Sequence, residues 1–255
     1  MASQAAGSTT GMRPTDHFGV PLAKLLSAKI STVYSAFNTK QFLTSIQSSC
    51  EDLSLTQRVE LIADRLKTNL PADFGRAIMI LHKIMGPENP NETGMFTNYY
   101  WLLPVGKFVE KYGLDHYDES IKAIEEITKR NTGEYAIRPF IRTYPREAIR
   151  QMKIWARSDN FHLRRLASEG LRPKLPWASK LHLFIEKPKP VFEILSILKE
   201  DPIRFVKKSV ANHLTDYLKV NPKAGYELIK KWLDTTNEHT AWIIKHATRK
   251  HTPNI

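Results

Sequence analysis

The sequence predicts an all-α fold made of many short helices, and three observations support this prediction. Apolar residues recur at spacings of three and four along the 255-residue chain, no stretch alternates polar and apolar residues between hairpin turns, and fifteen prolines interrupt it. Spacings of three and four place side chains on one face of a helix, whereas strands alternate with a period of two. Frequent breakers favour short, tightly joined helices over a few long ones.

Four segments show the helical pattern most clearly. In segment 57–68 the apolar residues fall on one stripe, and segments 75–86 and 117–130 repeat this arrangement. Segment 222–233 opens with Pro222, a residue that is tolerated in the first turn of a helix. Each of these segments is therefore predicted to form an amphipathic helix.

The second half of the sequence repeats itself with an offset of 43 residues. This offset places the basic pair Arg164–Arg165 on the pair Lys207–Lys208. Four segments share a polar or acidic start, an apolar position and then basic residues: 133–140, 158–169, 200–212 and 238–247. A period near 40 with this pattern is typical of the helical hairpins of HEAT repeats. Stacked hairpins bury their apolar faces together and leave a concave surface, so we predict a superhelical solenoid with a concave basic cleft.

The predicted organisation is one continuous domain with an N-terminal leader. Residues 1–15 are small and polar and are expected to be a disordered leader, not a secretory signal. Residues 16–130 are expected to be a helical region that packs as part of the solenoid. Residues 131–255 are expected to be HEAT-like repeats that carry the cleft and the active site.

Composition excludes several classes of function. Cys50 is the one cysteine, so an intrachain disulfide and a cysteine-based metal site are both excluded, and an intracellular, cytoplasmic location is expected. No apolar run approaches the roughly 18–20 residues that span a bilayer. The nine histidines lack a regular ligand spacing, and no glycine-rich phosphate-binding motif occurs. We therefore expect no membrane association, no metal and no nucleotide cofactor.

The net charge of +12 lies entirely in the second half of the chain. Residues 1–130 contain 14 Lys and Arg against 14 Asp and Glu, whereas residues 131–255 contain 24 against 12. Such segregation favours a polyanionic partner, most simply nucleic acid. The alternative is a solvated basic surface that serves solubility.

One carboxylate stands among the basic residues of segment 161–177. Arg165 and Glu169 are four residues apart and share a helix face, and Trp177 follows on a proline-bracketed loop. An acidic side chain at a phosphate-binding surface lowers affinity unless it faces something cationic. Two interpretations remain open: a reactive carboxylate beside an aromatic ring, or an Arg165–Glu169 ion pair with Trp177 in the core.

Four strings resemble the diagnostic blocks of the AlkC/AlkD family of alkylation-repair DNA glycosylases, and most closely its AlkC branch. They are YAIRPFIRTYP (135–145), RRLASEGLRPKLPW (164–177), VKKSVANHLTD (206–216) and WIIKHATR (242–249). The resemblance runs from about residue 16 to 250. It implies a solenoid of HEAT-like hairpins that binds double-stranded DNA, and monofunctional removal of alkylated bases, chiefly N3-methyladenine and also N3-methylcytosine.

The resemblance also implies roles for individual residues. Glu169 and Trp177 match the family's catalytic carboxylate and tryptophan, and Glu134 with Tyr135 matches a second active-site pair. Arg165 would orient Glu169 or hold a phosphate. The residues expected to contact DNA are Arg138, Arg164, Arg165, Arg172, Lys174, Lys207, Lys208, Asn212, Trp242, Lys245, His246 and Arg249. If Glu169→Gln retained full excision of N3-methyladenine, this catalytic assignment would fail.

Two further expectations follow from the resemblance. The family acts without full base flipping, so no deep base pocket is expected. Some members of this branch carry an immunoglobulin-like C-terminal domain, and we expect this chain, whose sequence ends soon after the last helical block, to lack it. The predicted function is therefore that of a monomeric, cofactor-free DNA glycosylase. The rivals are a non-catalytic HEAT-type binder of nucleic acid or of an acidic protein, and a related glycosylase that prefers N7-alkylated purines.

Overall fold

The computed structural model describes residues 14–94 and 96–249, and these residues form α-helices joined by turns and loops. Most of the predicted leader, residues 1–13, lies outside the described residues. Its last two residues are an exception to the prediction of disorder, because the first helix begins at Pro14.

The helices fall into two groups along the chain. The first group is α1 (Pro14–His17), α2 (Val20–Ser31), α3 (Thr39–Gln47), α4 (Leu55–Asn69), α5 (Phe74–Lys83), the 3-10 helix η1 (Tyr100–Leu102), α6 (Leu103–Tyr112) and α7 (Tyr117–Thr128). The second group is α8 (Arg138–Thr143), α9 (Pro145–Trp155), α10 (Phe161–Glu169), α11 (His182–Glu186), α12 (Lys189–Leu198), α13 (Arg204–Val220), α14 (Pro222–Trp232) and α15 (Glu238–Thr248). The four segments predicted as helices from their periodicity are α4, α5, α7 and α14, so those predictions are confirmed.

Polar side chains fix where several helices begin. The Ser54 side chain and Gln57 form a reciprocal capping box at the start of α4. Asn160 accepts a hydrogen bond from His162 N at the start of α10, and Asn237 caps α15 in the same way. Each cap satisfies backbone N–H groups that the first turn of a helix leaves without partners. Each of these two helices therefore begins at its own capping asparagine.

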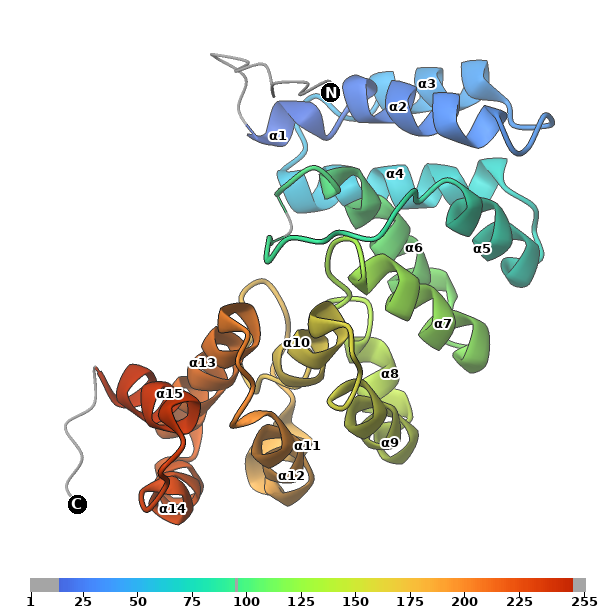
Figure 1. Cartoon of the computed structure of the whole chain (residues 1–255). Helices are drawn as coiled ribbons and strands as arrows, with labels where there is room; N and C mark the ends of the chain where they lie inside the picture. Colours follow the sequence, from blue (N-terminus) through green and yellow to red (C-terminus); the bar gives the residue numbers. More distant parts are fainter. Residues whose placement is uncertain (1–13, 95, 250–255) are drawn as a thin grey trace, which may run out of the picture.

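The helices follow an arc, from α2 and α3 at one end to α14 and α15 at the other (Figure 1). In its second half α10 packs against α13 and α13 against α15, which makes a row of inner helices. The outer helices α9, α12 and α14 each precede one inner helix and pack on it. The predicted solenoid of helical hairpins is confirmed, with segments 158–169, 200–212 and 238–247 on the inner helices. Segment 133–140 differs, because it forms a turn and the start of the short helix α8.

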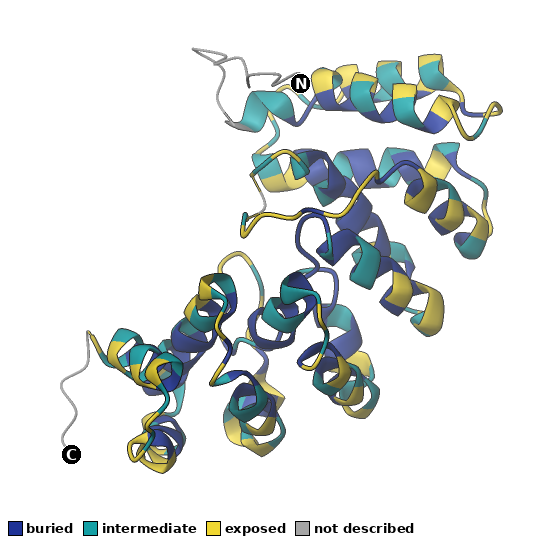
Figure 2. Ribbon diagram, viewed as in Figure 1, coloured by how far each residue is buried: buried dark blue, intermediate teal, exposed yellow. Residues whose placement is uncertain are grey.

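One hydrophobic core runs through the arc, from Phe18 in the first turns to Ala247 in the last helix. Figure 2 shows buried residues along the facing sides of the helices and exposed residues at their outer ends. Trp155 is 1% exposed, and its indole N–H donates to Glu125 Oε2 at 3.1 Å. A buried indole satisfied in this way ties the outer helix α9 to α7 of the preceding turn.

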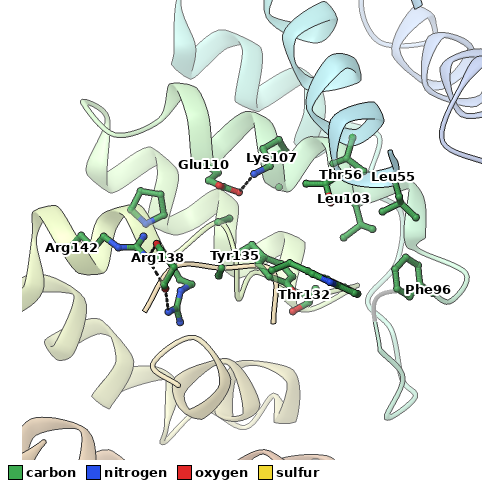
Figure 3. Close-up of a pocket in the computed structure, with 17 residues that line it drawn as sticks. Leu55, Thr56, Phe96, Leu103, Lys107, Glu110, Thr132, Tyr135, Arg138 and Arg142 are labelled. Atoms are coloured by element: carbon green, nitrogen blue, oxygen red, sulfur yellow. Dashed lines mark hydrogen bonds and ion pairs between the residues drawn. The ribbon is translucent and has the colours of Figure 1, made fainter. Parts of the chain in front are cut away.

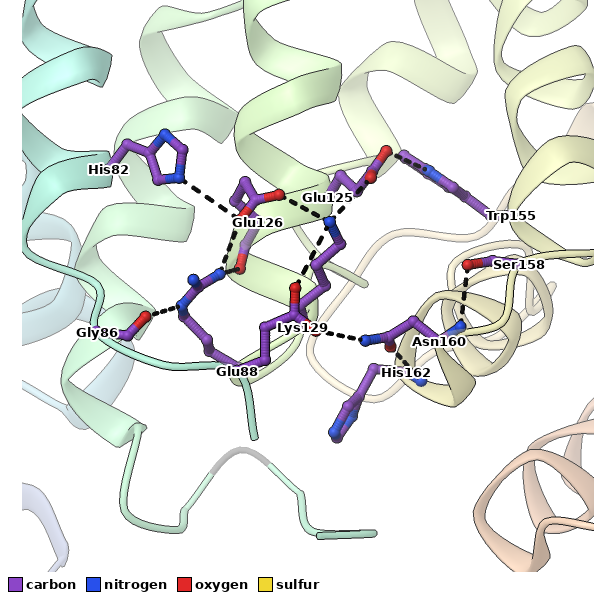
Figure 4. A network of polar contacts seen from close by, with 11 residues as sticks. His82, Gly86, Glu88, Glu125, Glu126, Lys129, Trp155, Ser158, Asn160 and His162 are labelled. Carbon is purple, nitrogen blue, oxygen red and sulfur yellow. Dashed lines mark hydrogen bonds and ion pairs between the residues drawn. The ribbon is translucent and has the colours of Figure 1, made fainter. Parts of the chain in front are cut away.

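A long segment between α5 and η1, residues 84–94 and 96–99, contains no helix and lies against the repeats. Asn89 donates its backbone N–H to Lys129 O at 3.0 Å, and its carbonyl lies 3.0 Å from His162 Nε2. Figure 4 shows the polar network around Lys129, whose ammonium group contacts three glutamates, with Glu125 and Glu126 on α7 and Glu88 on the segment. These contacts fix the path of the segment past the start of α10, and therefore its place beside the site described next.

Candidate active site

Glu169 is the last residue of α10 and is almost fully enclosed, with 6% of its surface exposed. Arg172 Nη1 donates to its Oε1 at 2.7 Å, and Ser209 Oγ donates to its Oε2 at 2.6 Å. Burial raises the pKa of this carboxyl, but the charges of Arg165 and Arg172 and the Ser209 hydrogen bond outweigh that effect and lower it. Glu169 is therefore an ionised carboxylate with both oxygens engaged.

Arg165, one helical turn earlier, lies between two carboxylates. Its Nη1 is 2.8 Å from Glu134 Oε2, and its Nη2 is 3.7 Å from Glu169 Oε1. The guanidinium also lies over the Phe205 ring, 4.6 Å from the ring centroid. Of the two roles predicted for Arg165, this geometry supports orientation of Glu169, and the phosphate contact stays a prediction.

Glu134 reaches the site from the turn before α8 and is 3% exposed. Thr132 Oγ1 donates to its Oε2 at 2.7 Å, and the ion pair with Arg165 uses the same oxygen. Among the described residues no hydrogen bond or ion pair reaches Oε1, although the side chain is almost fully enclosed. The turn requires Gly133, because a Cβ there would lie 2.4 Å from Thr128 Oγ1.

A third carboxylate completes the charged group. Arg172 Nε donates to Asp216 Oδ2 at 2.8 Å, while its Nη1 holds Glu169. Burial raises the pKa of Asp216, and the neighbouring Arg172 acts in the opposite direction. With all groups ionised, the three carboxylates and two guanidiniums give one net negative charge inside a strongly basic half of the chain. Such a group favours a cation over an anion.

Trp177 lies on the loop after α10, and its surface is 76% exposed. Its backbone has φ of 59°, in the left-handed region that side chains other than glycine rarely adopt. The alternative that Trp177 fills the core is therefore wrong. An exposed ring held in an unfavourable conformation indicates a surface built for a ligand.

Arg138 holds the loop that carries Trp177, and the prediction that it contacts DNA needs correction. It is 1% exposed, and its Nη1 donates to Gly170 O at 3.1 Å and to Arg172 O at 2.9 Å. Its Nη2 donates to Ser179 O at 2.6 Å. A buried guanidinium that serves three carbonyls cannot also reach a phosphate.

Arg164 and Arg172 likewise make contacts within the protein. Arg164 Nε donates to Asp201 Oδ2 at 2.6 Å, and its Nη1 donates to the carbonyls of Ser158 and Asp159 at 2.9 Å. Arg172 is shared by Glu169 and Asp216 as described above. The contacts with Asp201 and Asp216 join neighbouring repeats, and the predicted phosphate contacts of these two arginines stay predictions.

The remaining predicted DNA contacts lie on or near the inner helices. The exposed cations are Lys174, Lys208, Lys245 and Arg249. Lys207, Asn212, Trp242 and His246 are half-buried. Trp242 stacks on His246 with centroids 4.8 Å apart, and the Lys207 ammonium lies 5.6 Å from the Trp242 ring. The exposed group remains predicted to bind DNA.

A cavity of about 220 Å³ opens beside the carboxylates, although no deep base pocket was expected. Figure 3 shows Thr132 and Tyr135 on one side of it and residues of helices α4 and α6 on the other, and Trp177 also lines it. Tyr135 is half-buried, and burial, together with the charges of Glu134 and Glu169, raises the pKa of its hydroxyl. The tyrosine therefore keeps its proton at neutral pH.

Four residues of the site escaped the sequence analysis: Thr132, Phe205, Ser209 and Asp216. The signal that could have found two of them is the repeat offset of 43, because residues about one repeat apart lie on adjacent inner helices. Ser209 is 40 residues after Glu169, and Asp216 is 44 after Arg172. No comparable signal pointed to Thr132 or Phe205.

His213 lies behind the site and gives a pH-dependence that can be tested. It is fully buried, and burial together with the charge of Arg172 lowers its pKa to about 3. The unfolded state therefore binds a proton below pH 6.5 that the folded state does not, so stability falls as the pH decreases from 6.5 towards 3. Between pH 6.5 and 5 we expect a loss of about 2 kcal/mol from this residue.

Urea unfolding at pH 7 and pH 5 measures this loss. In His213→Leu the decrease in stability between the two pH values should shrink by about 2 kcal/mol relative to the wild type, while other titrating groups contribute equally to both proteins. An equal decrease in both proteins would show that His213 is not the group responsible.

Two absences hold for residues 14–94 and 96–249. No group of three or more His, Cys, Asp or Glu side chains is placed to hold a metal ion. No helix in this part of the chain combines the length and the apolar character needed to cross a membrane.

Comparisons with known proteins find similarity in both sequence and structure. The structure resembles that of Pseudomonas fluorescens alkylpurine DNA glycosylase AlkC bound to DNA containing an abasic site analog, with a TM-score of 0.84 and 33% identity over 94% of this chain. The uncharacterized protein YhaZ of Bacillus subtilis strain 168 is 37% identical over 86% of this chain. The chain spans 65% of the length of AlkC and 59% of that of YhaZ. Residues 59–251, which include every side chain of the charged group, match the DNA alkylation repair enzymes, and the chain therefore belongs to that family.

Proposed function

We propose that this protein is a DNA glycosylase that removes cationic alkylated bases from double-stranded DNA. The observation that carries the proposal is the pair of buried carboxylates, Glu134 and Glu169, bridged by Arg165, together with the exposed ring of Trp177. The likeness to AlkC, whose structure contains DNA with an abasic site analog, supports the same reaction. The proposed substrates are N3-methyladenine and N3-methylcytosine, and the proposed active form is a monomer without a cofactor.

The net negative charge of the group suits the reaction. An N3-alkylated base is already cationic, so its bond to C1′ breaks with little acid catalysis and leaves positive charge on the deoxyribose. A fixed carboxylate stabilises that charge, and a carboxylate oxygen also orients the attacking water. The leaving base takes the electrons of the broken bond and becomes neutral, the water oxygen bonds to C1′, and the released proton passes to solvent.

The two carboxylates are proposed to divide this work. Glu134 has no hydrogen bond or ion pair at Oε1 among the described residues and is the better candidate for contact with the sugar or the water. Glu169 has both oxygens engaged and supplies fixed charge at short range. Trp177 offers an electron-rich face to the cationic base or the sugar edge. No full extrusion of the base is required for these contacts, because the group lies on the inner side of the arc.

Release of bases from methylated genomic DNA tests the proposal. DNA treated with a methylating agent is incubated with the protein, and the free bases are separated and quantified by chromatography. Release of N3-methyladenine is the expected result. A protein that binds this DNA but releases no base would instead be a non-catalytic binding module. Release dominated by N7-methylguanine would indicate a relative that prefers N7-alkylated purines.

The exposed cations of the last inner helices should determine how DNA binding depends on salt. Lys208, Lys245 and Arg249 are exposed on α13 or at the end of α15. Replacing all three by alanine is expected to reduce the slope of log K against log salt concentration by about 2 to 3, because each phosphate contact contributes about 0.9. Fluorescence anisotropy with a labelled duplex at several salt concentrations measures this slope.

A matched control lies on the outer helix of the same hairpin. Three exposed lysines of α14 can be replaced together with the same change in charge: Lys223, Lys230 and Lys231. This control should leave the slope close to that of the wild type. Equal reductions in both triple variants would contradict a DNA-binding surface on the inner helices.

A further inference from the structure

The cavity beside the carboxylates joins the two halves of the chain. Leu55 of α4 and Leu103 of α6 lie on one side and Tyr135 on the other (Figure 3), and Val59 and Trp177 also line the cavity. Its volume of about 220 Å³ is below the roughly 300–1,000 Å³ of pockets that hold drug-sized ligands. The space therefore suits one small planar molecule.

The cavity and the charged group share structural elements. Thr132 lines the cavity, and its hydroxyl donates to Glu134 Oε2 at 2.7 Å. Tyr135 follows Glu134 in the chain, and its ring is part of the lining. The wall of the cavity is therefore joined directly to one carboxylate of the charged group.

The lining favours an aromatic ligand. Phe96, Tyr135 and Trp177 provide aromatic surface, and Phe96 and Trp177 are 52% and 76% exposed. Aromatic rings that face open space bind the flat faces of nucleobases, and each stacking contact contributes about 1–3 kcal/mol. At the far side, Lys107 Nζ lies 2.7 Å from Glu110 Oε2, so these two charges cancel and offer polar partners for a ring edge. The two arginines of the lining, Arg138 and Arg142, both donate to the carbonyl of Ser179.

We infer that this cavity is a nucleobase-binding site that holds the excised purine base. The origin of the base rests on the proposed function, whereas the binding itself does not. The ligand is a methylated purine, such as N3-methyladenine, which is neutral once released and stacks on the aromatic side chains. It reaches the cavity as the free product.

Gly106 makes the site testable, because it lines the cavity on α6 and a Cβ added there meets nothing within 4 Å. Gly106→Leu therefore places a side chain in the open space and removes a glycine from a helix, which does not oppose folding. Gly75, on α5 and away from this cavity, offers a matched control, since its added Cβ is 3.6 Å from the nearest atom. Gly75→Leu should bind the base as the wild type does.

Isothermal titration with free N3-methyladenine measures the binding. The wild type and Gly75→Leu should bind the base, and Gly106→Leu should bind it at least about tenfold more weakly. Equal binding by all three proteins, or no binding by the wild type at millimolar base, would overturn the inference. Unfolding transitions of the three proteins verify that each is folded.

Single-turnover excision then tests whether the base enters only after cleavage. If it does, Gly106→Leu loses product inhibition by added N3-methyladenine but still completes the first turnover at the wild-type rate. This result, with the loss of free-base binding, supports the inference. A first turnover slowed by the same variant would contradict entry after cleavage. A wild type that binds the free base but excises nothing from DNA would contradict the proposed function alone.

Discussion

Replacing Glu134 by glutamine is expected to lower kcat/KM for excision of N3-methyladenine by about 10²–10³-fold, the range seen when one preorganised electrostatic contact is removed from an active site. The reason is the loss of negative charge beside the forming sugar cation. The fold should persist, since the glutamine amide oxygen can still accept from Thr132 Oγ1 and Arg165 keeps Glu169 as a partner. Single-turnover kinetics on a duplex with one lesion, together with urea unfolding, measures both quantities.

A matched control is available on the outer face. Glu193 of α12 pairs with Lys153 at 2.6 Å, so Glu193→Gln makes the same chemical change far from the charged group, and excision should be unaffected. Glu169→Gln should lower excision as well, but with a loss of stability, because it weakens the contacts to Arg172 and Ser209. Wild-type excision by Glu134→Gln would leave Glu169 as the sole reactive carboxylate.

The fold was predictable from sequence because its signals are local or periodic. Helical spacing identified α4, α5, α7 and α14, and the offset of 43 identified the three inner helices that pack in a row. Both signals depend on apolar patterning, which packing in a solenoid preserves. The turn around Gly133 departs from the pattern, because there the chain brings Glu134 to the site and does not complete an inner helix.

The site was predictable only in part, because charge counts do not show which cations are already paired. Arg165 and Glu169 share a helix face, and that contact followed from their spacing. Arg138 and Arg164 looked equivalent to the exposed lysines in sequence. In the structure Arg138 serves backbone carbonyls, and Arg164 meets Asp201 from the next repeat. A count of the basic residues in the sequence therefore overestimates how many of them DNA can contact.

The second large effect is expected at Arg165, where Arg165→Met should reduce the free energy of unfolding by about 3–5 kcal/mol. The substitution leaves Glu134, which is 3% exposed, without its cationic partner, and it removes the contact with the Phe205 ring. Urea unfolding at neutral pH measures the loss. The free energy of unfolding of Arg165→Lys should lie between those of the wild type and Arg165→Met, because one ammonium keeps the charge but cannot span both carboxylates.

A double-mutant cycle separates an ion pair from a phosphate contact at this position. If Arg165 orients the carboxylates, Arg165→Met combined with Glu134→Gln should recover part of the stability, with a coupling energy of about 0.5–3 kcal/mol. If Arg165 held a phosphate, Arg165→Met would keep the stability of the wild type. The slope of log K for DNA binding against log salt concentration would then fall by about 0.9. The distances of 2.8 Å to Glu134 and 3.7 Å to Glu169 favour the first outcome. On this view Arg165 keeps two like charges at a fixed spacing, and that spacing allows both to face one cationic sugar.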